Sequence, residues 1–127
     1  MNTIQVTQND YNTLMELLAR NPGATEDEKT RQGALLSELL RADILPEAEI
    51  APDVITLRRR AHLVELESGD VLDYTLVLPE EADVNEGRIS ILAPLGTAML
   101  GFRRGDVFEW TMPGGAMKLK VENVLRG

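Results

Sequence analysis

The chain has 127 residues, of which 43% are hydrophobic, and carries a formal net charge of −8. This length suits one domain with a small appendage, and the apolar content is sufficient for a packed core. The absence of cysteine excludes disulfides and thiolate zinc sites. Because Lys and Arg supply the affinity for phosphate backbones, so acidic a chain predicts no specific nucleic-acid binding. The negative charge suits either a solvated surface or attraction to a basic partner.

No apolar run approaches the roughly 20 residues that cross a bilayer. The N-terminal sequence MNTIQVTQND lacks the charged and apolar regions of a signal peptide. We therefore expect a cytoplasmic protein that makes no contact with a membrane.

Two amphipathic helices are predicted first. Thr7 is a candidate N-cap for a helix that ends near Arg20, and Thr25, with Glu28 three residues later, opens a second helix of about 18 residues. The apolar positions with helical spacing are Tyr11, Leu14, Met15 and Leu18 in the first helix, and Leu35, Leu36, Leu39, Leu40 and Ala42 in the second. Because only a short Asn-Pro-Gly break separates them, they predict an antiparallel helical hairpin, a short coiled coil over residues 1–46.

Residues 47–52 are predicted as a linker, and residues 53–127 as a small antiparallel sheet with one short helix. Strands are expected at 54–57, 61–66 and 71–78, with a hairpin turn at 67–70 and an acidic loop at 79–86. The predicted fold class is therefore α+β.

The most informative stretch is 89–115, ISILAPLGTAMLGFRRGDVFEWTMPGG. A strand over 89–92 leads into a helix with Pro94 in its first turn, and Gly101 is placed to end that helix in the left-handed conformation. A turn at 105–106 leads to a strand in which Phe108, Trp110 and Met112 share a face, and Pro113-Gly114-Gly115 predicts a reversal in which Gly114 has a positive φ. Met117, Leu119 and Val121 then alternate in the last strand.

This stretch resembles the C-terminal domain of the bacterial Gre transcript cleavage factors. The shared pattern consists of Pro94-Leu95-Gly96, Leu100-Gly101, Gly105-Asp106 and Pro113-Gly114-Gly115, extended upstream by 74–77, 79–83 and 87–91. The similarity covers roughly 53–124. It implies an FKBP-like fold and binding to RNA polymerase at the rim of its secondary channel. In Gre factors an Asp-Ser-Pro loop contacts the polymerase, and the matching positions are Leu92, Ala93 and Pro94, of which only the proline is retained.

Three acids, Glu26, Asp27 and Glu28, fall at the predicted tip of the hairpin. Acids in a first turn complement the helix dipole, which alone explains them. By resemblance they could instead face a basic surface or a Mg²⁺ site in the polymerase. The longer Gre hairpins carry a different acidic tip motif. The shorter hairpin makes the chain more similar to the regulator of nucleoside diphosphate kinase (Rnk), a Gre relative, and argues against transcript cleavage.

The remaining polar candidates favour structural roles. His62 is the only histidine and is expected to be structural or to face solvent. The basic run 58–60 and the pair 103–104 are interpreted as a solvated sheet edge that discourages strand pairing, a polyanion site being the alternative. No metal ligands, catalytic residues or cofactor are predicted.

The sequence thus predicts a monomeric, non-enzymatic transcription regulator that occupies the secondary-channel region and competes with Gre factors. An FKBP-like prolyl isomerase is the enzymatic alternative, although Tyr74, Phe108 and Trp110 supply few aromatic walls for a proline pocket. A general protein-interaction module with another partner is the third hypothesis.

Overall fold

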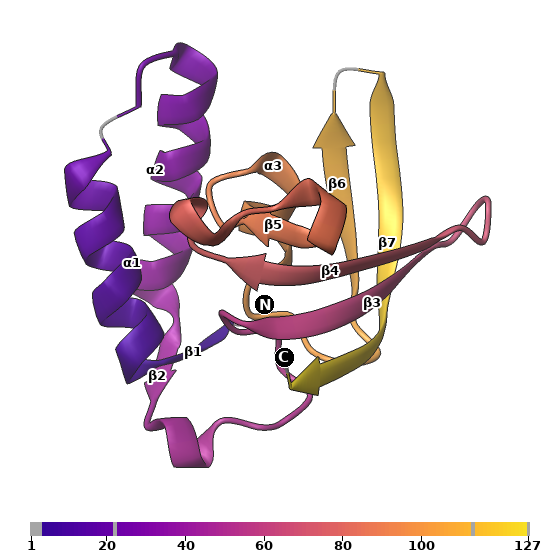
Figure 1. Ribbon diagram of the computed structural model, residues 1–127, viewed down its shortest axis with the longest axis horizontal. Coiled ribbons are helices and arrows are strands. Elements are labelled where there is room, and N and C mark those ends of the chain that lie inside the picture. The colour runs from indigo at the N-terminus through magenta and orange to yellow at the C-terminus, as the bar shows by residue number, and fades with distance from the viewer. Residues whose placement is uncertain (1–3, 22, 113, 127) are drawn as a thin grey trace. The chain divides into compact units, whose positions relative to one another are not determined.

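The computed structural model describes residues 4–21, 23–112 and 114–126. The fold is α+β, as the sequence predicts, with the two longer helices first and a five-stranded sheet after them (Figure 1). The chain divides into two compact units, Met1–Ala51 and Pro52–Gly127. No helix within the described ranges has the length and apolarity needed to cross a membrane.

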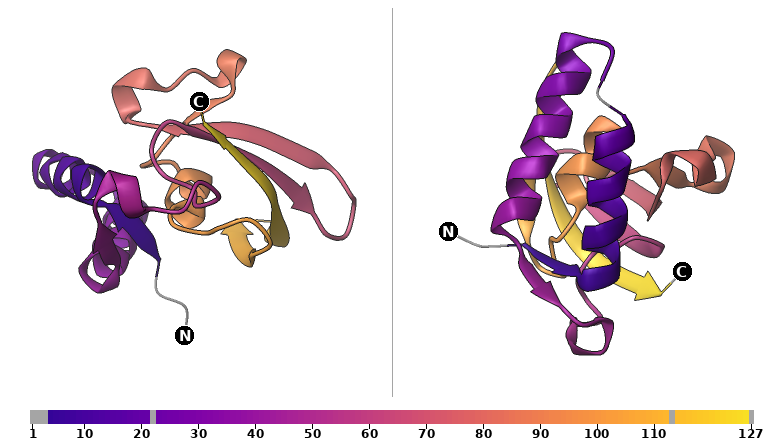
Figure 2. Two further views of the ribbon diagram at one scale, coloured as in Figure 1. Left: turned by 90° about the horizontal axis from the view of Figure 1, so that it is seen from below. Right: turned by 90° about the vertical axis from the view of Figure 1, so that its left-hand side faces the viewer.

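The first unit contains helices α1 (Gln8–Arg20) and α2 (Glu26–Arg41), which lie side by side (Figures 1 and 2). Both predicted N-caps are confirmed. The Thr7 hydroxyl accepts a hydrogen bond from the backbone N of Asp10 at 3.0 Å, and the Thr25 hydroxyl accepts one from the backbone N of Glu28 at 3.1 Å. The caps satisfy donors that a helix start leaves without partners.

Two short strands of this unit were not predicted. β1 (Gln5–Thr7) and β2 (Asp43–Leu45) flank the helices and pair in parallel, and a 3₁₀ turn, η1 (Glu47–Glu49), follows. The apolar stripe of α2 is narrower than predicted, because Leu35 and Leu39 are buried whereas Leu40 is 64% exposed. Ala42 is the C-cap of α2 and lies outside the helix.

The second unit is built on a sheet with strand order β5-β4-β3-β7-β6. Its strands are β3 (Arg59–Glu65), β4 (Val71–Val77), β5 (Arg88–Ser90), β6 (Val107–Met112) and β7 (Gly115–Arg126). The prediction of a purely antiparallel sheet is wrong, because β4 and β5 pair in parallel. Two 3₁₀ turns, η2 (Pro79–Glu81) and η3 (Val84–Glu86), make the crossover between these parallel strands, which a tight hairpin could not make.

Helix α3 (Pro94–Met99) lies within the curve of this sheet (Figure 2). Along β3, Ala61, Leu63 and Glu65 are buried, whereas His62 and Val64 are half-buried on the other face. Leu95 and Met99 of α3 are buried in turn. The alternation in β3 and the helical spacing in α3 thus supply the core of this unit.

The predicted strand at 54–57 is wrong. Within it only Val54 forms a β-bridge, to Arg103, and a backbone hydrogen bond from Arg59 N to the Thr56 carbonyl closes a turn. Arg58, in this turn, has a left-handed backbone with φ 69°, which a regular strand excludes. The predicted strand at 89–92 is also shorter, since β5 ends at Ser90.

The glycine predicted to end α3 is confirmed, because Gly101 has φ 84° directly after the C-cap Leu100. In the β6–β7 reversal, Gly115 has φ 136° and Gly114 lies outside the left-handed region, so the left-handed conformation expected of Gly114 is wrong. Pro113, and the side-chain direction predicted for Met112, lie outside the described residues and side chains.

Candidate functional site

The loop Leu92–Pro94 joins β5 to α3. Leu92 and Ala93 are half-buried and Pro94 is exposed, while Ile91 before the loop is fully buried and Leu95 after it is 3% exposed. The loop is therefore fixed at both ends by core residues and presents a small apolar surface between them. No ionisable residue occurs from Ile89 to Phe102, so this surface suits packing against a protein better than acid–base chemistry.

Hydrogen bonds made by Ser90 and Thr97 hold the backbone of this loop. The Ser90 hydroxyl accepts from the backbone N of Leu92 at 3.0 Å, and the Ser90 carbonyl accepts from the backbone N of Ala93 at 3.0 Å. The Thr97 hydroxyl donates to the Ile91 carbonyl at 2.6 Å. The Ala93 carbonyl accepts from the backbone N of Thr97 at 2.9 Å, which begins α3.

The sequence predicts the three loop residues as a contact site, which stays a prediction, and it gives no signal for the hydrogen bonds of Ser90 and Thr97. A lone serine or threonine carries no spacing signature, and Thr97 reaches Ile91 only because α3 turns back over the end of β5. Gly96 belongs to the Pro-Leu-Gly pattern in the sequence, and its role becomes visible in its close approach to Ser90.

The acids Glu26, Asp27 and Glu28 lie in the first turn of α2. The Glu28 carboxylate accepts a hydrogen bond from the backbone N of Ala24 at 2.8 Å, and Glu26 is 4.0 Å from the Lys29 ammonium. These contacts are those of a capped helix start, where acidic side chains complement the helix dipole. In the described part of the chain, no group of three or more His, Asp or Glu side chains is arranged to hold a metal ion.

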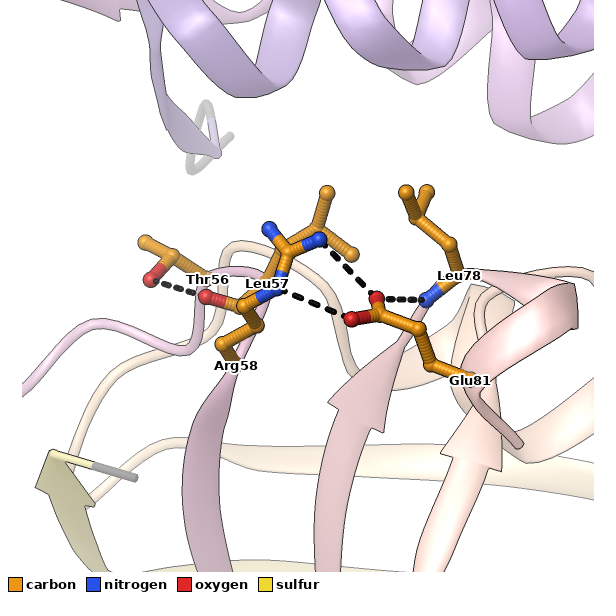
Figure 3. A network of polar contacts seen from close by, with 5 residues as sticks. All are labelled: Thr56, Leu57, Arg58, Leu78 and Glu81. Carbon is orange, nitrogen blue, oxygen red and sulfur yellow. Dashed lines mark hydrogen bonds and ion pairs between the residues drawn. The ribbon is translucent and has the colours of Figure 1, made fainter. Parts of the chain in front are cut away.

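The interpretation of Arg58, Arg59 and Arg60 as a solvated sheet edge is wrong, because β3 lies in the middle of the sheet. Arg58 makes two hydrogen bonds to the Glu81 carboxylate, at 3.0 and 3.2 Å, and that carboxylate also accepts from the backbone N of Leu78 (Figure 3). Arg59 is 8% exposed and donates to the Val54 carbonyl at 2.8 Å. Arg58 therefore ties the turn that precedes β3 to the turn that follows β4, and Arg59 holds the segment before β3 against the start of that strand.

Arg60 pairs with Asp73 across β3 and β4 through two hydrogen bonds, at 2.7 and 2.5 Å. His62 Nδ1 lies 3.4 Å from the same carboxylate. The hydrogen bonds from Arg60 hold the pKa of Asp73 below its usual range, against the opposing effect of burial. His62 thus lies half-buried beside the Arg60–Asp73 ion pair, which agrees with the structural or solvent-facing position predicted for it.

The aromatic residues contribute to packing. Phe108 is 6% exposed and stacks on Phe102, with ring centroids 4.8 Å apart and planes inclined by 10°. Trp110 is half-buried, and its indole nitrogen has no hydrogen-bond partner among the described residues.

Arg103 of the second basic pair lies 3.7 Å from the Asp53 carboxylate.

Comparison with known proteins identifies relatives of both units. The family sequence model described as "Transcription elongation factor, GreA/GreB, C-term" matches residues 50–126. The regulator of nucleoside diphosphate kinase of Escherichia coli K12 is 39% identical over 82 residues, which cover 65% of this chain and 60% of that protein. The transcription elongation factor GreA of Chloroherpeton thalassium is 33% identical over 105 residues, covering 80% of this chain and 66% of that protein. The chain thus matches about 60% of the length of the first of these relatives.

Solved structures extend the similarity to nearly the whole chain. A prokaryotic transcription elongation factor GreA/GreB from Nitrosomonas europaea superposes with a TM-score of 0.82 at 31% identity, covering 98% of this chain and 99% of that one. The GreA factor homolog 1 (Gfh1) of Thermus thermophilus gives a TM-score of 0.51 at 28% identity, covering 97% and 99%.

Proposed function

The chain belongs to the GreA/GreB family of transcription elongation factors, and on that premise we propose that it is a transcription regulator that binds RNA polymerase through the loop Leu92–Pro94. The observation that supports the proposal is the apolar, anchored surface of this loop. An apolar segment anchored by the buried Ile91 and Leu95 presents Pro94 to solvent, at the position that matches the polymerase-contacting loop of Gre factors. A compact apolar surface of this kind suits the centre of a protein interface.

We propose further that the protein occupies the secondary channel without stimulating transcript cleavage, as a monomer in the cytoplasm and with an FKBP-like second unit. Helix α2 has 16 residues, which corresponds to about 24 Å at 1.5 Å per residue. A helical hairpin of this length would enter the channel without reaching the active centre. Two of its three tip acids, Glu26 and Glu28, already contact Lys29 and Ala24.

Competition binding tests the first proposal. The full-length protein should bind core RNA polymerase and displace a labelled GreA factor from it. If a saturating concentration of the protein leaves the affinity of GreA for polymerase unchanged, the proposed binding site is wrong.

An assay on a halted, backtracked elongation complex tests the second proposal. GreA should shorten the transcript, the protein alone should not, and addition of the protein should inhibit GreA. Robust Mg²⁺-dependent cleavage by the protein alone would contradict the proposal. The binding and cleavage assays are independent. If the protein binds polymerase but also stimulates cleavage, the proposed binding site stands and only the proposed lack of cleavage is wrong.

A further inference from the structure

We propose that Ser90 and Thr97 are positioning residues, which hold the docking loop Leu92–Pro94 in its binding conformation without contacting the partner themselves. The inference rests on the proposed function, because it assigns a role in polymerase binding. It concerns a different property of the site, namely how a loop without polar side chains keeps one backbone shape.

The loop cannot fix its own backbone. Its residues, leucine, alanine and proline, have no side-chain hydrogen-bonding groups, and Ala93, the N-cap of α3, makes no side-chain cap. Ser, Thr, Asp and Asn are the preferred residues at the N-cap position, where their side chain accepts a hydrogen bond from the first turn of the helix. Here the ordering groups must come from outside the loop.

Ser90 and Thr97 supply those groups from the two sides. The Ser90 hydroxyl accepts from the backbone N of Leu92 at 3.0 Å, whereas the bond from the backbone N of Ala93 goes to the Ser90 carbonyl, also at 3.0 Å, and does not depend on the side chain. Thr97 spans six residues to donate its hydroxyl proton to the Ile91 carbonyl at 2.6 Å. The two hydroxyls thus bind the N–H and the C=O of a single peptide group, Ile91–Leu92, and fix the orientation of the backbone where it enters the loop.

The absence of glycine between 91 and 95 adds to this restriction, as does the fixed φ of Pro94. A loop that is ordered before binding loses less conformational entropy in the complex, so the same contacts give a higher affinity. Removal of either hydroxyl should therefore weaken binding by more than its effect on folding explains.

The structure offers a matched control for Ser90. Ser68 lies in the β3–β4 turn, and its hydroxyl accepts from the backbone N two residues later, that of Asp70, at 3.2 Å. Ser90→Ala and Ser68→Ala thus remove the same kind of local hydrogen bond at two places, and Ser68→Ala also removes a longer bond, of 3.5 Å, from its hydroxyl to the Glu65 carboxylate. We expect similar small decreases in melting temperature for both. Only Ser90→Ala should weaken polymerase binding, by about fivefold, which corresponds to about 1 kcal/mol.

Thr97 is tested by replacement with two residues of similar size. Thr97→Val removes the hydroxyl and keeps the shape, and Thr97→Ser keeps the hydroxyl. We expect about fivefold weaker binding for Thr97→Val, recovery to within twofold of wild type for Thr97→Ser, and no change for Thr75→Val. The Thr75 side chain is a suitable control because it makes no hydrogen bond within the described ranges and lies in β4, at the pairing with Arg60.

For each variant, the affinity for core polymerase and the dissociation rate are measured by surface plasmon resonance on immobilised polymerase. The melting temperature is measured in parallel. If the wild-type protein does not bind polymerase at all, the proposed function fails. If the wild type binds, and Ser90→Ala and Thr97→Val bind as tightly as Ser68→Ala and Thr75→Val, the positioning role is overturned and the proposed function stands. If Thr97→Val fails to fold, the comparison of the two serine variants decides the question.

Discussion

A Cβ atom added to Gly96 would lie 2.0 Å from the carbonyl oxygen of Ser90. The same atom would lie 2.9 Å from the Ser90 carbonyl carbon and 3.2 Å from the Ile91 Cα, so each of these close neighbours belongs to the backbone. No side-chain rotation can relieve such contacts. The absence of a side chain at residue 96 is therefore what allows α3 to pack against the end of β5, where the loop Leu92–Pro94 begins.

Gly96→Ala should destabilise the protein by about 1–3 kcal/mol or more, because the backbone of α3 or β5 must shift. Gly33→Ala is the matched control. Gly33 is exposed within α2 and has no neighbour within 4 Å of an added Cβ, so this substitution should stabilise by about 0.5–1 kcal/mol. Urea unfolding of both variants tests the pair, and a decrease in stability for Gly33→Ala or an increase for Gly96→Ala would contradict the packing described.

Arg59→Ala should destabilise by about 1–3 kcal/mol, because it leaves the carbonyl of the buried Val54 without the guanidinium that donates to it. Arg104→Ala is the control, since Arg104 is exposed and surface substitutions usually change stability by less than about 0.5 kcal/mol. Equal melting temperatures for the two variants would show that Arg59 makes no net contribution to the fold.

Gly101→Val should destabilise strongly, whereas Gly114→Val should be tolerated. Gly101 has φ 84°, a conformation in which a β-branched residue is strained, and Gly114 lies outside that region with no neighbour within 4 Å of an added Cβ. Thermal melts separate the two variants. A larger decrease for Gly114→Val would indicate a different conformation of the β6–β7 turn.

Asp73→Asn should lower stability near neutral pH and have little effect in strong acid. Because the hydrogen bonds from Arg60 hold the pKa of Asp73 below its usual range, the folded state binds this proton less readily than the unfolded state. The resulting stabilisation is fully present above the unfolded-state pKa, about 3.9 for Asp. It disappears as pH falls through the lower pKa of the folded state.

Urea unfolding from pH 7 down to pH 2 would measure this difference. Asp70→Asn, in the β3–β4 turn, is the control, because its carboxylate makes no ion pair in the described part of the chain. A difference between wild type and Asp73→Asn that stays constant over the whole pH range would rule out the ionised carboxylate as its source.

Ala93→Glu should weaken polymerase binding by about tenfold or more while the melting temperature changes little. Ala93 is half-buried in an uncharged stretch, and a carboxylate placed there would be desolvated against the partner. Pro94→Ala is a gentler companion variant, expected to cost about 0.4–1 kcal/mol of stability through the unfolded state. Wild-type affinity in an intact Ala93→Glu variant would remove the loop from the interface.

Local signals in the sequence predicted the local structure of this protein well. Thr7 and Thr25 cap the helices, Pro94 begins α3 and Gly101 follows its end, because each of these features depends on a few consecutive residues. The errors arise where contacts between distant segments of the chain determine the structure. Arg59 reads as part of an exposed basic run, and only the placement of β3 between β4 and β7 turns its side chain inward.

The proposed docking loop, Leu92–Pro94, shows the same difference between local and distant signals. The positions of Leu92, Ala93 and Pro94 follow from a resemblance in sequence order, but the contacts that hold them involve Thr97 and Ile91, which a helical turn brings together. Likewise, the pairing of Arg58 with Glu81 joins residues 23 positions apart in the sequence. It involves a left-handed backbone at Arg58, a conformation that a glycine would have indicated in the sequence. Such contacts depend on the tertiary structure and have no pattern in the linear sequence.

The central position of β3 also has a consequence for the rate of folding. Its pairing with β4 is a local hairpin. Its pairing with β7 places Arg59 opposite Arg126 and Glu65 opposite Leu119, so the paired residues are separated in sequence by most of the second unit. Closing so long a loop costs conformational entropy before any contact repays it, and topologies of this kind fold more slowly than those with local contacts. The β3–β4 hairpin should therefore form early, and the arrival of β7 on its open edge should limit the rate at which the sheet is completed.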